Sequence, residues 1–148
     1  LDEALAHIDG PVVLIAHSAG VMTVAHWGQA LPMNDLRAQR IRGALLATPA
    51  DVERPLPAGY PSTADLDAGG WLPIPRCRLP FVSLLAASRN DPLAQLARVQ
   101  GFAQDWGSQL VDIGAVGHLN PTAGFGPWPQ AKALLVQLAR LNQRAGRA

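Results

Sequence analysis

One serine of this chain lies between small residues, where an apolar run gives way to a second apolar pattern. The segment Ala16-His17-Ser18-Ala19-Gly20 follows the run Val12–Ile15 and opens a helical pattern. A serine at so tight a strand-to-helix turn takes a strained backbone conformation, which pushes its hydroxyl out at the top of the sheet. Large side chains two residues away would collide with the strand or the helix, which explains Ala16 and Gly20. The pattern predicts a nucleophile at Ser18, with a helix N-cap as the alternative.

A nucleophilic serine needs a base, and the base needs an orienting acid. His118 lies in a glycine-flanked loop after the last predicted strand, and Asp91 follows the third predicted strand. The chain order serine, acid, histidine is the one found with this type of elbow. We therefore predict a triad of Ser18, Asp91 and His118. Asp91 precedes a proline and could also cap a helix; Asp51, after the second strand, is the alternative acid.

Three further residues are candidates for the same site. The backbone N–H of Ala19 is expected to donate one oxyanion hydrogen bond. His17 is predicted to contact substrate, although adjacent side chains at an elbow point apart. Trp71 is a candidate for lining the substrate pocket, with packing as the alternative.

The elements that must position these residues alternate between strand and helix. The apolar patterns predict strands over 12–15, 42–47, 81–87 and 109–113, and helices over 1–8, 19–31, 92–106 and 128–141, with a frayed tail over 142–148. Continuous apolar runs indicate strands that are buried on both faces. The sequence therefore predicts a three-layer α/β/α sandwich with a mainly parallel sheet, as a single domain over residues 1–148.

Between the second and third strands lies a long segment rich in proline and glycine, residues 48–78. Segments of this length inside a compact domain are usually functional or disordered. This one begins at the sheet edge where ligands bind in open α/β sheets. We predict that it forms one wall of the substrate pocket and includes a short helix over 63–67.

Composition narrows the class of protein. The chain has 148 residues, 49% of them hydrophobic, which is enough for one self-supporting core. Twelve basic and 11 acidic side chains form no basic patch, so nucleic acid is not an expected partner. No apolar run reaches the roughly 20 residues of a membrane helix, and no membrane association is expected. The single cysteine fits a reducing compartment, so we expect a cytoplasmic protein.

The chain begins at Leu1, inside an amphipathic pattern. We expect the natural protein to have about 30 to 45 more residues at its start, which suits a domain of typical size. The predicted strands after Val12–Ile15 can supply only one flank, so the fold is expected to lack its N-terminal strand. The elbow strand should then lie at a sheet edge.

Several segments together resemble the YdeN and retinoblastoma-binding protein 9 family of small serine hydrolases, within the α/β-hydrolase superfamily. They are Ile15–Gly20, Gly43–Val52, Leu79–Phe81, Ala87–Pro92 and Gly117–Asn120. The run Ser88-Arg89-Asn90-Asp91-Pro92 is the most specific of them. The resemblance implies an α/β-hydrolase fold and a triad on Ser18, Asp91 and His118.

These observations favour a serine hydrolase that cleaves small carboxylic esters through an acyl-enzyme, with no metal and no other cofactor. The alternative is a binding or interaction module on a hydrolase-like fold, with an unspecified protein partner. A flavodoxin-like nucleotide-binding domain would share the alternating elements. The turn at residues 17–20 has neither a Walker lysine nor a G-x-G-x-x-G fingerprint, which weakens that third hypothesis.

Overall fold

A four-stranded parallel sheet organises the computed structural model, which describes residues 1–32 and 34–146. The strands follow the chain in the order β1 (Val12–His17), β2 (Ile41–Ala47), β3 (Ser83–Ala87) and β4 (Gln109–Asp112). The helices are α1 (Asp2–Ala6), α2 (Ala19–Ala30), α3 (Leu36–Arg40), α4 (Thr63–Ala68), α5 (Leu96–Trp106) and α6 (Ala131–Ala145), with a 3₁₀ turn η1 (Pro121–Ala123). In the part of the chain that the structure describes, no helix combines the length and apolar character that crossing a membrane requires.

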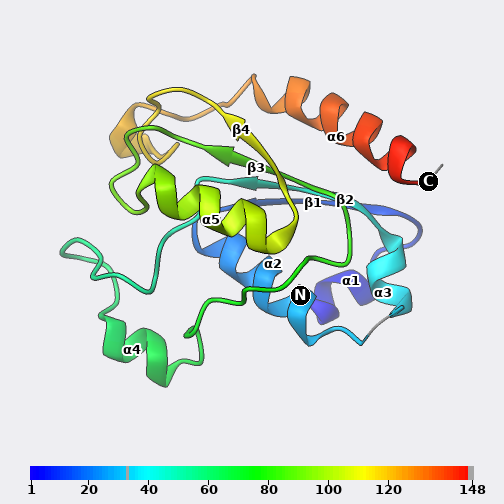
Figure 1. Cartoon of the computed structure of the whole chain (residues 1–148), viewed down its shortest axis with the longest axis horizontal. Coiled ribbons are helices and arrows are strands. Elements are labelled where there is room, and N and C mark those ends of the chain that lie inside the picture. Colours follow the sequence, from blue (N-terminus) through cyan, green and yellow to red (C-terminus); the bar gives the residue numbers. More distant parts are fainter. Residues whose placement is uncertain (33, 147–148) are drawn as a thin grey trace.

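The sheet lies between two helical layers, with α6 on one face and α2 and α5 on the other (Figure 1). Alternate residues of the central strands supply the two cores. Leu45 and Leu84 pack under α6, whereas Leu46 and Leu85 join the larger core beneath α2 and α5. Because both faces are covered, every residue of β3 is buried. The predicted three-layer α/β/α sandwich is confirmed.

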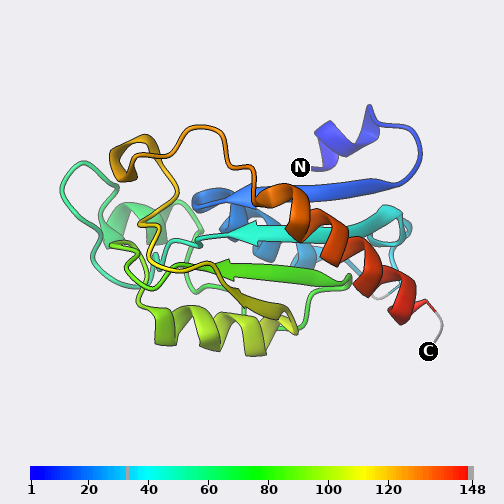
Figure 2. The same cartoon turned by 90° about the horizontal axis from the view of Figure 1, so that it is seen from above.

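The elbow strand β1 lies at the edge of the sheet, as predicted, and pairs with β2 (Figure 2). Leu14 and Ala16 point into the core beneath α2. Val13 and Ile15 point to the opposite face, where they remain 48% and 62% exposed.

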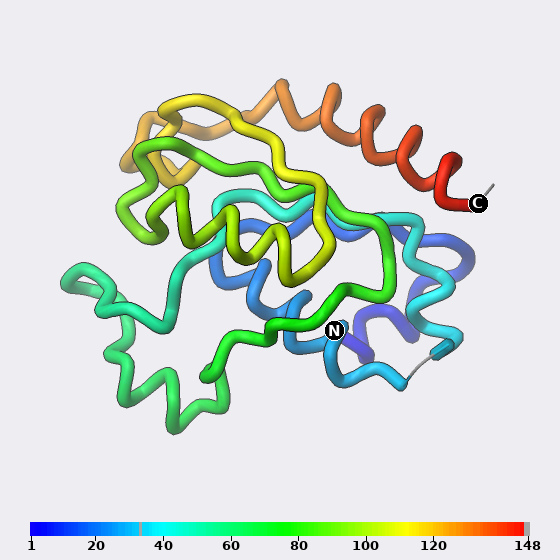
Figure 3. The backbone as a smooth tube through the Cα atoms, viewed as in Figure 1, coloured from blue at the N-terminus to red at the C-terminus, as the bar shows by residue number. Residues whose placement is uncertain are grey.

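The connection from β2 to β3 is the longest in the fold. It leaves the sheet after Ala47, passes through α4, and returns to the opposite end of the sheet, where β3 begins (Figure 3). The expected short helix is present as α4, whose N-terminus has a capping box between Ser62 and Asp65.

Two predicted helices begin later than expected. α5 was predicted from Pro92 but begins at Leu96. The carbonyl of Leu93 accepts from the backbone N–H of Asp51 rather than from its own helix, and residues 92–94 form a turn. α6 was predicted from Trp128 but begins at Ala131, since bonds between residues three apart precede it.

Other boundaries also shift. α6 continues to Ala145 where a frayed tail was expected, and residues 147–148 of that tail lie outside the described residues. β3 starts at Ser83 rather than Phe81, whose ring stacks on Trp27 at 6.2 Å. The five-residue α3 was not predicted because it is too short to show a helical period.

Candidate active site

Ser18, Asp91 and His118 follow three different strands and meet at the C-terminal edge of the sheet. The Oγ atom of Ser18 lies 2.7 Å from Nε2 of His118, and Nδ1 of His118 lies 3.0 and 2.9 Å from the carboxylate oxygens of Asp91. The side chains of His118 and Asp91 are only 4% and 2% exposed. Because a carboxylate can only accept, Nδ1 carries the proton, and Nε2 is left to accept from the Ser18 hydroxyl. The proximity predicted from the sequence is present.

The elbow holds Ser18 in the predicted strained conformation, with φ 57° and ψ −123°. Its N–H donates to the carbonyl of Ala47 on β2 at 3.1 Å, which anchors the turn to the neighbouring strand. A Cβ atom at Gly20 would lie 3.8 Å from the Cβ of Ala16, in ordinary van der Waals contact, so the two small residues lie close together across the turn. The Ser18 hydroxyl is bonded to His118 instead of capping α2.

Ala19 is the first residue of α2. The first N–H groups of a helix have no acceptor within that helix and lie at the positive end of its dipole. Ala19 directly follows Ser18, so its backbone N–H lies next to the Ser18 hydroxyl. This N–H is free to donate a hydrogen bond to a negative charge that develops there.

Asp91 faces His118 but does not cap α5, whose N-cap residue is Gln95, and Asp51 has a different partner. Oδ1 of Asp91 accepts from the backbone N–H of Leu93 at 2.8 Å as well as from His118. Asp51 is buried, and both its carboxylate oxygens accept from Arg98 on α5, at 2.7 and 3.0 Å. The carboxylate that faces the histidine is thus that of Asp91.

The Asp51–Arg98 pair belongs to a larger charged cluster that joins the proline-rich segment to α5. Glu53 also accepts from Arg98 and from Arg76, and it takes the backbone N–H of Ile74 at 3.0 Å. Burial raises the pKa of Glu53, but these three donors outweigh burial and leave the pKa below its ordinary value of 4.5. The cluster fixes the course of the segment beside Asp91.

His17, at the end of β1, contacts the loop that carries His118. Its Nε2 donates to the backbone carbonyl of His118 at 2.7 Å, and the two rings lie 5.0 Å apart. Ser18 and its neighbour His17 contact different parts of the same residue, because Ser18 meets the ring of His118 and His17 meets its backbone carbonyl. Contact between His17 and substrate stays a prediction.

Trp71 lies against α2. Its ring meets His26 edge-on at 6.0 Å, and His26 Nε2 donates to the Trp71 carbonyl at 3.1 Å. His26 is two helical turns beyond Ser18 on α2. These contacts support the packing alternative for Trp71, and its place in a substrate pocket stays a prediction.

Sequence reasoning missed a second group of polar contacts beside Asp91. Ser88 and Asn90 accept from the backbone N–H groups of Val116 and Gly117, at 3.2 and 2.7 Å. The only signal for them was the run Ser88–Pro92, which was noted as the most specific part of a resemblance.

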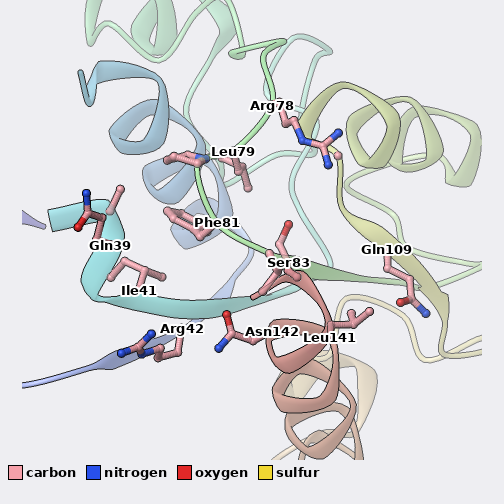
Figure 4. A pocket seen from close by; sticks show the side chains of 15 residues that line it. Gln39, Ile41, Arg42, Arg78, Leu79, Phe81, Ser83, Gln109, Leu141 and Asn142 are labelled. Carbon is pink, nitrogen blue, oxygen red and sulfur yellow. The ribbon is translucent and has the colours of Figure 1, made fainter. Parts of the chain in front are cut away.

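A cavity of about 440 Å³ lies at the opposite end of the sheet (Figure 4). It is lined by the first residues of three strands, including Ile41, Ser83 and Gln109. Because Ser18 and His118 follow the last residues of their strands, this cavity is separate from the site.

The chain is similar to known serine hydrolases in sequence and in fold. The protein-family model described as Serine hydrolase matches residues 1–137. A solved YdeN-like hydrolase from Pectobacterium atrosepticum is 33% identical with a TM-score of 0.74, and the match covers 95% of this chain and 66% of that one. A hydrolase of the alpha/beta superfamily from Xanthomonas campestris is 22% identical with a TM-score of 0.47, covering 92% of this chain and 60% of that one.

A carboxylesterase from Bacillus cereus is 16% identical with a TM-score of 0.42, covering 99% of this chain and 55% of that one. The chain therefore spans between 55% and 66% of the lengths of these three proteins. No curated protein matches the chain.

Proposed function

The chain belongs to the serine hydrolase family and has an α/β-hydrolase fold, and we propose on that premise that it hydrolyses small carboxylic esters through an acyl-enzyme on Ser18. The observation that carries the proposal is the continuous hydrogen-bonded series from Asp91 through His118 to Ser18. The serine also has the strained backbone conformation of a nucleophile elbow.

The proposed reaction follows from these contacts. Ser18 Oγ attacks the ester carbonyl while Nε2 of His118 takes its proton, and Asp91 stabilises the imidazolium that forms. The N–H of Ala19 donates to the oxyanion of the tetrahedral intermediate. His118 then gives the proton to the leaving alcohol, and an acyl group remains on Ser18. Water, activated by the same histidine, releases the acid and restores the serine.

We further propose that the proline-rich segment from Thr48 to Arg78 forms one wall of the substrate pocket. It leaves β2 at the edge where Ser18 lies, and prolines lower the entropy that is lost when an irregular path is held. The ion pair between Asp51 and Arg98 holds the start of this segment against α5, which gives the wall a fixed base.

A fluorophosphonate probe tests the proposal, because covalent labelling requires an activated serine. The protein should be labelled at Ser18, and Ser18→Ala should abolish both labelling and hydrolysis of short p-nitrophenyl esters without changing the fold. Ser108→Ala is the matched control, because Ser108 lies at the opposite edge of the sheet, where its hydroxyl meets that of Ser83. Absence of labelling on the folded full-length protein would contradict the proposal and favour a binding module instead.

A further inference from the structure

The loop that carries His118 leaves the sheet where backbone pairing between β3 and β4 ends. The last regular bonds run from Ile113 N–H to the carbonyl of Ala87 at 3.0 Å, and from Arg89 N–H to the carbonyl of Gly114 at 2.8 Å. Beyond Gly114 the loop curls back toward Ser18, so its next N–H groups need acceptors other than a strand.

Two side chains of the β3 end supply those acceptors. Ser88 Oγ accepts from the N–H of Val116 at 3.2 Å, and Asn90 Oδ1 accepts from the N–H of Gly117 at 2.7 Å. The Ser88 hydroxyl in turn donates to Asn90 Oδ1 at 3.0 Å. Ser88 is 1% exposed, so its hydroxyl is a buried group with both a donor and an acceptor partner.

The bond between Gly117 and Asn90 connects the immediate neighbours of the proposed acid and base. Asn90 precedes Asp91, and Gly117 precedes His118. Gly117 and Leu119, on either side of His118, have φ values of 58° and 49°. Glycine adopts such values readily, whereas a leucine does so only rarely. The bond from Gly117 to Asn90 therefore holds the histidine at a fixed distance from its carboxylate.

We propose that Asn90, together with Ser88, is a positioning residue that fixes the backbone before His118 and so sets the imidazole between Asp91 and Ser18. The inference rests on the proposed function in its kinetic consequences only. The placement of the His118 ring by Asn90 is the same whether or not an ester is the substrate.

Replacement of Asn90 separates positioning from a general loss of structure. Asn90→Ala removes the acceptor of the Gly117 N–H and should slow fluorophosphonate labelling of Ser18 about 10- to 100-fold, because small displacements of reacting groups cost rates of this order. kcat for a p-nitrophenyl ester should fall with KM nearly unchanged. Asn90→Asp retains an oxygen at the same place and should restore most of the rate.

Arg89→Ala is the matched control in the same turn, since the Arg89 side chain makes an exposed ion pair with Asp112. It should label within about twofold of the unmodified protein, because exposed ion pairs contribute little. Ser88→Ala is a second test, because it removes the acceptor of the Val116 N–H and leaves Asn90 in place. The labelling rate should fall less than in Asn90→Ala. Wild-type labelling by a folded Asn90→Ala protein, or no recovery in Asn90→Asp, would overturn the inference.

A spectroscopic measurement keeps the two proposals distinguishable. The proton on His118 Nδ1, which is held by Asp91, should give a slowly exchanging low-field NMR resonance that Asn90→Ala weakens and Asn90→Asp retains. If the unmodified protein is not labelled at Ser18, the proposed function fails, and this resonance still decides the placement of the ring. An unchanged resonance in Asn90→Ala would refute the positioning role.

Discussion

Gly117 offers a test of how tightly the histidine loop is packed. Its φ of 58° lies in the left-handed region, and a Cβ atom there would lie 2.7 Å from the Cβ of Ala123 on η1. Ordinary contact begins at 3.4 Å, so η1 or the loop must retreat by at least 0.7 Å, the difference between those two distances. Gly117→Ala therefore introduces both backbone strain and a steric overlap next to His118.

The two costs can be estimated separately. An alanine in the left-handed region costs roughly 1–2 kcal/mol, and overpacking costs about 1–3 kcal/mol. Ala123 is exposed, so the turn can shift, and the cost of the overlap should fall at the low end of that range, about 1 kcal/mol. Gly117→Ala should thus lower the free energy of unfolding by about 2–3 kcal/mol and Tm by about 5–10 °C.

A double-mutant cycle isolates the overlap. Ala123→Gly removes the opposing Cβ, so Gly117→Ala/Ala123→Gly should regain about 1 kcal/mol relative to the sum of the single changes, while the backbone strain remains. Fluorophosphonate labelling of Ser18 should fall about tenfold or more in Gly117→Ala and recover in part in the double variant. Additivity of the two changes within about 0.5 kcal/mol in urea unfolding would refute the overlap.

Three further predictions follow from the site and its supports. Asp91→Asn should lower kcat about 10⁴-fold, as in other triads, whereas Asp51→Asn should change kcat at most a few-fold and lower stability by about 2–3 kcal/mol, because it leaves Arg98 without its buried partner; equal kcat losses would contradict these assignments. The pKa of Glu53 is lowered on folding, so its contribution to stability is present above pH 4.5 and is lost as pH falls through the lowered value. In urea unfolding, the free energy of unfolding of Glu53→Gln should therefore decrease less below pH 4.5 than that of the unmodified protein. Trp71→Ala should lower Tm, because its packing on His26 is lost. If Trp71 also lines the substrate pocket, the variant's relative rates for esters of different chain length should differ from those of the unmodified protein; unchanged relative rates would exclude that role.

The sequence predicts the sheet well because its strands are buried on both faces. A run such as Leu84–Ala87 has little alternative to a central strand, and its carboxyl end must lie at the same edge as those of its parallel neighbours. Ser18, Asp91 and His118 could be found in this way, since each follows a strand end. Their grouping requires only the direction of the strands, which the apolar patterns supply.

The boundaries that differ from prediction depend on tertiary contacts. Pro92 after Asp91 is a good local signal for a helix start, yet the carbonyl of Leu93 is taken by the N–H of Asp51, 42 positions earlier in the chain. Neither residue type signals such a bond. The same limit applies to His17, whose partner is a backbone carbonyl that every residue possesses.

The contacts that hold the site together also explain why an edge strand can carry the elbow. Ser18 is anchored to β2 through the carbonyl of Ala47, and His17 fastens the end of β1 to the His118 loop. The loop is fastened independently to the end of β3 by Asn90. Ser18 and His118 are thus each hydrogen-bonded to at least two strand ends, and these bonds support their 2.7 Å contact beside an edge strand. Removal of the hydrogen bonds made by His17 and Asn90 should consequently lengthen the Ser18–His118 contact before it destabilises the sheet.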